Sequence, residues 1–195
     1  MRELSLHALD ILQNAREAGA TLVHLTVAED LAADRLVLEV RDNGRGMGEE
    51  TLKRLKDPFF TTRKTRHVGL GLPLLAAAAE RCTGSLEVES APGQGTRVTA
   101  VFQWSHLDRA PLGDITGTLI SFLLGEPFCD LVYVRRRDGN EFSLDTREVR
   151  RELEPVGLSH PRVREWLAGT LSRAEAALGI PAAGNSGAPT GGKEV

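Results

Sequence analysis

The stretch Arg41-Asp-Asn-Gly-Arg-Gly-Met47 decides how the rest of this 195-residue chain is interpreted. An alternating apolar run, Leu36, Leu38 and Val40, leads into it and predicts a strand that ends near Asp42. The glycines that follow let the main chain approach another group closely, and Asp42 can accept a hydrogen bond from such a group. On these residues alone, an ordinary acidic turn is as good an interpretation as a ligand-binding edge.

The composition is that of a globular protein. Hydrophobic residues make up 41% and charged residues 26% of the chain, and the net charge is -3. No overall basic field favours nucleic acid or an anionic membrane, so we expect neither as a partner. Cys82 and Cys129 fit no metal-binding spacing, and no apolar run is long enough to span a bilayer. Because the amino terminus also lacks the apolar core of a signal peptide, we expect a cytoplasmic protein.

Residues 3 to 18 are predicted to form an amphipathic helix with an unusual polar face. His7, Asp10, Asn14 and Glu17 share that face at spacings of three and four residues. A solvated side is the simplest interpretation. Asn and Asp are poor formers of helix interiors, however, and the residues after Asn14 are small enough to let another segment pack closely.

Periodicity and turn residues predict strands over 21–29, 35–41, 85–91 and 96–104 and helices over 49–56 and 72–82. The first two strands and the last two are each expected to pair as antiparallel hairpins. The turn Pro92-Gly-Gln-Gly95 reads as purely structural on its own.

Residues 59–68 show neither the helical nor the strand periodicity, and they concentrate positive charge in Arg63, Lys64 and Arg66. A solvated basic loop is one interpretation. Gly69 and Gly71 come next and open an apolar helix, whose free N–H groups and dipole favour an anion. With a cationic loop directly before it, we expect that anion to be phosphate.

Two common nucleotide motifs are excluded. The chain has no Gly-x4-Gly-Lys-Ser/Thr loop, and the glycines at 44, 46 and 48 lack the dinucleotide spacing and the strand that should follow.

Taken together, these motifs resemble the superfamily of gyrase, heat-shock chaperone, histidine kinase and MutL ATPases, also called GHKL, over roughly residues 3 to 104. The segment from Asp10 to Ala20 resembles the asparagine box, and Asp42 to Met47 the first glycine box. Asp57 to Arg63, then Gly69-Leu-Gly-Leu72, resemble the phenylalanine box, lid and second glycine box of histidine kinases. Gly93-Gln-Gly-Thr96 resembles the last glycine-threonine motif. The resemblance implies an α+β fold of the Bergerat type, a two-layer sandwich whose mixed, mostly antiparallel sheet is covered by helices.

The resemblance also implies an ATP and Mg²⁺ site. Asp42 would accept a hydrogen bond from the adenine amino group, with Gly46 and Thr96 lining the base pocket. Asn14 would offer its side-chain oxygen to Mg²⁺, a hard cation that prefers oxygen ligands. The N–H groups around Gly69 and Gly71, with Arg63 or Lys64, would neutralise the phosphates. The other implied ATP-binding residues are Gly44, Met47, Phe59, Thr61, Thr62, Leu70 and Leu72.

Asp10 departs from the family pattern. Four residues before the metal-binding asparagine, the hydrolysing branches carry a Glu base and histidine kinases usually carry Asn. Asp10 could activate water or a hydroxyl as a catalytic base, or it could hold a neighbouring group in place; both roles stay open. His7 lies inside the same helix rather than on a long preceding helix, so we expect a packed histidine and not a phosphoacceptor.

Beyond residue 104 the family motifs end. We expect an ATP-binding domain over 1–104, a small α+β appendage over 105–178 and a disordered tail over 179–195. Within the appendage, residues 115–124, 146–153 and 161–178 are predicted as helices, and 130–136 with 141–144 as a hairpin. The Arg135-Arg-Arg137 run is predicted to be a solvated strand end.

The whole chain further resembles stand-alone kinase-like ATPases that accompany iron hydrogenase genes in anaerobic bacteria, which implies an accessory or signalling role. We therefore expect a Mg-ATP-binding kinase-like protein that transfers the γ-phosphate to a protein partner carrying the phosphoacceptor. An ATP-hydrolysing switch and a nucleotide sensor without turnover are the alternatives.

Overall fold

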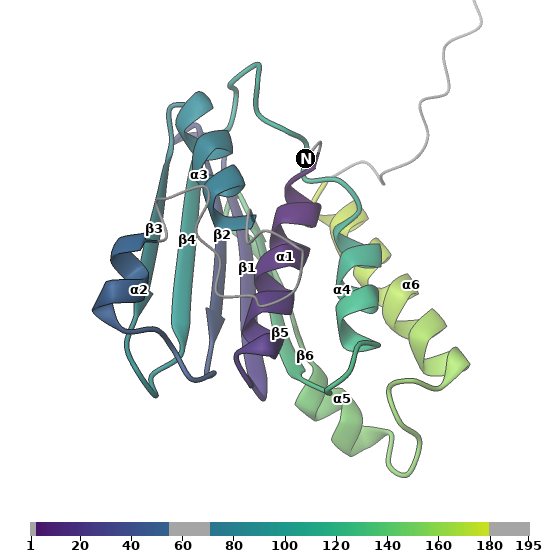
Figure 1. The fold of residues 1–195 in the computed structure, drawn as a ribbon. Helices are drawn as coiled ribbons and strands as arrows, with labels where there is room; N and C mark the ends of the chain where they lie inside the picture. Colours follow the sequence, from purple (N-terminus) through teal and green to yellow (C-terminus); the bar gives the residue numbers. More distant parts are fainter. Residues whose placement is uncertain (1–2, 55–70, 180–195) are drawn as a thin grey trace, which may run out of the picture.

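The computed structural model describes residues 3–54 and 71–179, in which one mixed sheet carries helices on one face (Figure 1). The strands in chain order are β1 (Leu22–Asp30), β2 (Arg35–Asp42), β3 (Ser85–Ser90), β4 (Thr96–Gln103), β5 (Asp130–Arg137) and β6 (Asn140–Asp145). Across the sheet their order is β3-β4-β2-β1-β5-β6. The helices are α1 (Leu4–Glu17), α2 (Glu49–Arg54), α3 (Gly71–Arg81), α4 (Ile115–Leu123), α5 (Thr146–Glu152) and α6 (Pro161–Ala177).

The central strands bury every second side chain, as their period of two predicts. Val23, Leu25 and Val27 of β1 are fully buried, and the alternate residues of β2 and β4 are buried with them. Figure 1 shows α3, α1, α4 and α6 side by side over this face. The predicted α+β sandwich with a mostly antiparallel sheet is therefore confirmed.

Strand β5 joins the sheet by parallel pairing with β1, in register from Leu22 opposite Asp130 to Glu29 opposite Arg137. The hairpin partner β6 then forms the edge next to β5. One cluster of buried apolar side chains runs from Leu4 in α1 to Leu171 in α6. Residues after 104 thus extend the sheet and share the core; that 1–104 acts as a separate ATP-binding domain stays a prediction.

The Arg135-Arg-Arg137 run corrects one expectation. Arg135 is fully buried, whereas the neighbouring Arg136 is exposed. The Arg135 guanidinium donates to Glu29 Oε1 at 2.9 Å and to Glu175 Oε2 at 3.2 Å. Tyr133 donates to the other oxygen of Glu175 at 2.7 Å. The alternation of β5 turns Arg135 inward, so it is an anchor between sheet and α6 and not a solvated strand end.

Candidate functional site

The loop that follows β2 begins at Asp42, a carboxylate that is only 8% exposed. Its Oδ1 accepts a hydrogen bond from the Gly44 N–H at 2.7 Å. Burial raises the pKa of Asp42 above its usual value, while the N–H groups of Gly44 and Thr96 oppose that rise. Asp42 is also the antiparallel partner of Thr96 in β4, so the two side chains lie next to each other on the helix-covered face.

The same loop packs main chain against main chain on the turn between β3 and β4. Gly93 donates its N–H to the Arg45 carbonyl at 2.7 Å. Gly46 has a φ of +65°, and a Cβ there would lie 2.0 Å from the Ala91 carbonyl oxygen. At Gly95, with a φ of +76°, a Cβ would lie 2.0 Å from the Asp42 carbonyl oxygen. Only glycine fits at these two positions. The turn between β3 and β4 therefore does more than reverse the chain, because its main chain packs on the Asp42 loop and holds that loop in place.

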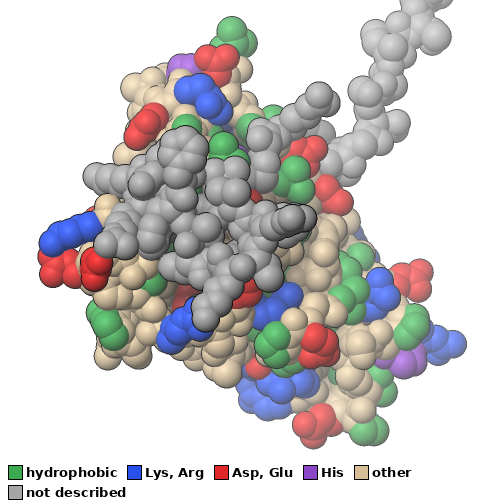
Figure 2. Space-filling view, viewed as in Figure 1, with side chains coloured by type: hydrophobic (Ala, Val, Ile, Leu, Met, Phe, Trp, Pro, Cys, Tyr) green, Lys and Arg blue, Asp and Glu red, His purple; other side chains and the backbone are tan. Residues whose placement is uncertain are grey.

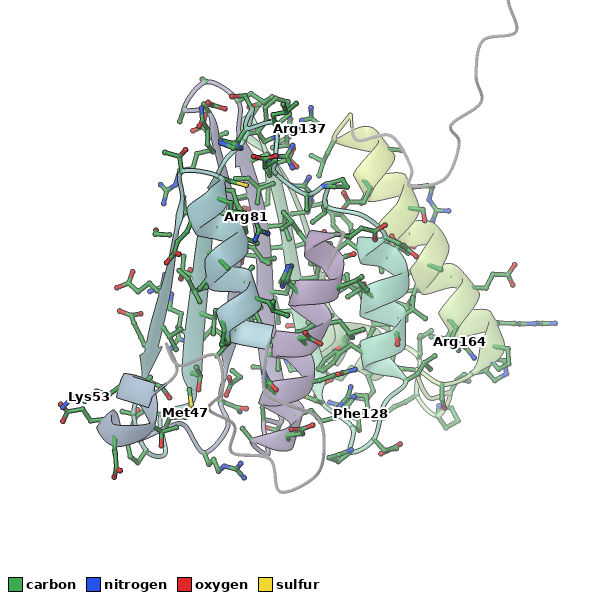
Figure 3. The ribbon with its side chains drawn as sticks, turned by 45° about the horizontal axis from the view of Figure 1, so that its top comes forward. Met47, Lys53, Arg81, Phe128, Arg137 and Arg164 are labelled. Atoms are coloured by element: carbon green, nitrogen blue, oxygen red, sulfur yellow. The ribbon has the colours of Figure 1, made fainter. Side chains whose placement is uncertain are left out.

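Ser90, at the end of β3, is a residue that the sequence analysis did not single out. Its hydroxyl bonds to the N–H of Met47, the carbonyl of Gly95 and the hydroxyl of Thr96. Met47 lies at the end of the sheet where β2 ends (Figure 3). A serine at a strand end carries no local signal of such a role; only its pairing with Thr96 in the sheet reveals it.

Helix α1 reaches the same region with the residues at its carboxyl end. Its carboxyl end packs on the loop, because the Arg45 N–H donates to the Ala18 carbonyl at 3.0 Å. A Cβ on Gly44 would lie 3.0 Å from the Cβ of Ala18, so the small residues after Asn14 do permit a close approach. Asn14 and Asp10 are half-buried and lie about one helical turn apart.

The amino terminus of α3 meets α1 at Asp10. A Cβ on Gly71, the first residue of α3, would lie 3.2 Å from Asp10 Oδ2. Leu72 follows and packs against the core. The structure therefore brings together Asp10, the start of α3 and, through the α1 carboxyl end, the Asp42 loop. The other predicted phosphate and lid residues lie outside the described residues: Phe59, Thr61, Thr62, Arg63, Lys64, Gly69 and Leu70.

A hollow of about 470 Å³ opens at this end of the sheet. It is lined by Arg41, Asp42, Glu89, Ser90, Ala91, Gln94, Gly95, Thr96 and Arg97. Arg41, Glu89 and Arg97 each adjoin a residue of the helix-covered face, so their side chains point to the opposite face. Arg97 is held there by Glu39 at 2.8 Å and Glu89 at 3.4 Å. The hollow therefore follows the rim of the sheet and borders the helix-covered site from outside.

Within residues 3–54 and 71–179, no group of three or more His, Cys, Asp or Glu side chains could hold a metal ion. Asn14 offers a single neutral oxygen. That is too little for a resident metal site, but it suits Mg²⁺ that arrives with phosphate oxygens and water as its other ligands.

His7 is packed, as predicted. It is 2% exposed, and its Nδ1 has no hydrogen-bond partner among the residues that the structure describes. Burial, with a contribution from the positive charge of Arg81 at the far end of α3 (Figure 3), lowers the pKa of His7 to about 4.

This shift predicts a pH-dependent loss of stability. Below pH 6.5 the unfolded chain binds a proton at His7 that the folded chain does not take up until about pH 4. Between pH 7 and pH 5 the free energy of unfolding should therefore fall by about 2 kcal/mol through this residue. Urea unfolding of wild type and His7→Gln at both pH values measures the effect. An equal loss in the variant would contradict it.

The visible surface of the described residues has no dominant charge sign (Figure 2). In the view of Figure 2, Lys and Arg side chains are interspersed with Asp and Glu over the described residues. None of the described helices is both long enough and apolar enough to cross a membrane.

Residues 1–106 match the family described as histidine kinase-, DNA gyrase B-, and HSP90-like ATPase, which is more than half of the chain. The chain belongs to this family. Its amino-terminal part is thus an ATP-binding domain of the histidine kinase-like type, as the order of motifs from Asp10 to Thr96 predicted.

Bacterial kinases are among the relatives of this ATPase domain. Sensor protein kinase FleS of Pseudomonas aeruginosa is 42% identical over 107 residues, which are 55% of this chain and 26% of FleS. Sporulation kinase C of Bacillus subtilis is 34% identical over 88 residues, and sporulation kinase E 39% over 89. Those two matches cover 45% of this chain but only 20% and 12% of the kinases. The chain therefore spans about a quarter or less of the length of these relatives.

Proposed function

We propose that this histidine kinase-like ATPase binds Mg-ATP and transfers the γ-phosphate to a partner protein in signalling. The observation that carries the proposal is the contact between Asp10 and the start of α3, where a Cβ on Gly71 would touch the carboxylate at 3.2 Å. An anion at the amino terminus of α3 would then lie beside a carboxylate and an amide on the facing helix. The sensor and sporulation kinases among the relatives support a signalling role.

In this proposal the adenine lies at Asp42 and Thr96, and the phosphates run toward α3. Asn14 provides one oxygen to the Mg²⁺ that bridges the phosphates, and Gly71 and Leu72 provide main-chain N–H groups. Arg63 and Lys64 supply positive charge next to the phosphates. Because phosphoryl transfer depends mainly on positioning and on charge neutralisation, these contacts are the larger part of catalysis.

Asp10 is proposed to act as the base. It would accept the proton of the attacking group as that group bonds to the γ-phosphorus and the bond to the bridging oxygen breaks, releasing ADP. A carboxylate here also favours the second candidate, an ATP-hydrolysing switch, because it can take a proton from water as well as from a protein acceptor.

The test uses the full chain, a co-purified partner and ATP labelled at the γ-phosphate. Label on the partner supports phosphotransfer. Free labelled phosphate in the absence of a partner supports the switch instead. ATP binding with neither result would contradict both and leave a nucleotide sensor.

A further inference from the structure

Ser90 connects three parts of the contact between the Asp42 loop and the turn that joins β3 and β4, at the proposed adenine end of the site. Its Oγ accepts from the Met47 N–H at 2.8 Å and donates to the Gly95 carbonyl at 2.7 Å. The same oxygen lies 3.0 Å from the Thr96 Oγ1. Asp42, Thr96 and Ser90 stand in one row across β2, β4 and β3, because Thr96 is the register partner of both others.

The hydrogen count at Ser90 fixes the direction of its bond to Thr96. A serine hydroxyl has one hydrogen and two lone pairs. A carbonyl oxygen can only accept, so the hydrogen of Ser90 goes to Gly95. Met47 fills one lone pair, and the contact with Thr96 must then use the other. The Thr96 hydroxyl therefore donates to Ser90.

We infer that Ser90 holds the Thr96 hydroxyl as a hydrogen-bond acceptor and so sets the preference of the site for a base that carries an amino group. With its hydrogen directed at Ser90, Thr96 offers only lone pairs to a ligand. Asp42, its neighbour in the row, is an acceptor as well when ionised. Two acceptors side by side suit the amino group of adenine and oppose the carbonyl oxygen that guanine carries in its place.

This inference rests on the proposed nucleotide site, and it makes Ser90 a positioning residue that acts through Thr96. In Ser90→Ala the Thr96 hydroxyl can rotate and donate its hydrogen to a carbonyl on the base. The penalty against guanine then falls, because an unpaired polar contact is replaced by a hydrogen bond.

Mg-ATP and Mg-GTP are titrated into the full chain to test this, with melting temperatures recorded for every variant. We expect Ser90→Ala to weaken ATP binding about fivefold and to reduce the ratio of the GTP and ATP dissociation constants about tenfold. Ser90→Thr, which keeps the hydroxyl, and Ser85→Ala, on the same edge strand away from the site, should keep the wild-type ratio. In a Thr96→Val background the Ser90→Ala change should no longer alter the ratio, since the group it positions is gone.

A lower melting temperature with an unchanged ratio in Ser90→Ala would overturn the inference, because it would make Ser90 a merely structural link. Additive effects of Ser90→Ala and Thr96→Val would overturn it too. If the wild type binds ATP and either result appears, only the role of Ser90 fails. If the wild type binds neither nucleotide, the proposed function fails and the inference with it.

Discussion

Asp10→Asn is expected to leave the affinity for ATP within about threefold of wild type while lowering turnover by about 10²- to 10⁴-fold. Asparagine keeps the shape of the side chain and its close approach to Gly71 at the start of α3, where an added Cβ would lie 3.2 Å from Asp10 Oδ2. It cannot take up a proton. Binding and turnover should therefore separate in this variant, which is the signature of a group that acts only in the transition state.

Calorimetry with ATP and an assay of phosphate release or label transfer measure the two quantities. Glu87→Gln is the matched control, because it removes an equal charge from the exposed outer face of β3. Equal turnover in Asp10→Asn and wild type would remove the base role and leave Asp10 as a residue that holds its neighbours in place.

Arg135→Ala is expected to lower the free energy of unfolding by about 3–5 kcal/mol. The substitution leaves buried Glu175 without the guanidinium that bonds to it at 3.2 Å. Buried Glu29 loses its bond of 2.9 Å and keeps only the longer ion pair with Arg137 at 3.6 Å. Uncompensated buried charge is among the costliest defects in a protein interior. Because the network ties β1, β5 and α6 together, the loss should appear as destabilisation of the whole chain.

Arg136→Ala is the control for this prediction. The adjacent arginine lies on the outer face of the same strand and pairs with Glu141 at 2.5 Å in solvent. Such exposed pairs contribute about 0–1 kcal/mol. Urea unfolding of the two variants should thus differ by several kcal/mol, and losses of equal size would contradict the buried network.

Local chemistry was enough to predict much of this fold. Alternation in the β1, β2 and β4 segments identified their buried faces, and turn residues set the hairpins. The glycines of the Asp42 loop also predicted a close approach of main chain. The structure shows which main-chain groups approach each other, since Gly46 packs against the carbonyl of Ala91 and Gly95 packs against the carbonyl of Asp42.

What could not be predicted depends on long-range pairing. Neither the β1 segment nor the β5 segment contains a sequence pattern that predicts their parallel register. Arg135 reads as a solvated end because its partners Glu29 and Glu175 lie 106 and 40 residues away in the chain. Ser90 is similar: its role appears only once the sheet places it opposite Thr96.

The most direct test of the nucleotide site is calorimetric titration of Mg-ATP into wild type, Asp42→Asn and Glu39→Gln. Glu39 lies on the same strand but on the opposite face, where it pairs with Arg97 at 2.8 Å. We expect wild type and Glu39→Gln to bind alike, and Asp42→Asn to bind about ten- to a hundredfold more weakly, since it loses a charge-assisted hydrogen bond. Unchanged affinity in Asp42→Asn would contradict the assignment of Asp42 as the adenine end of the site.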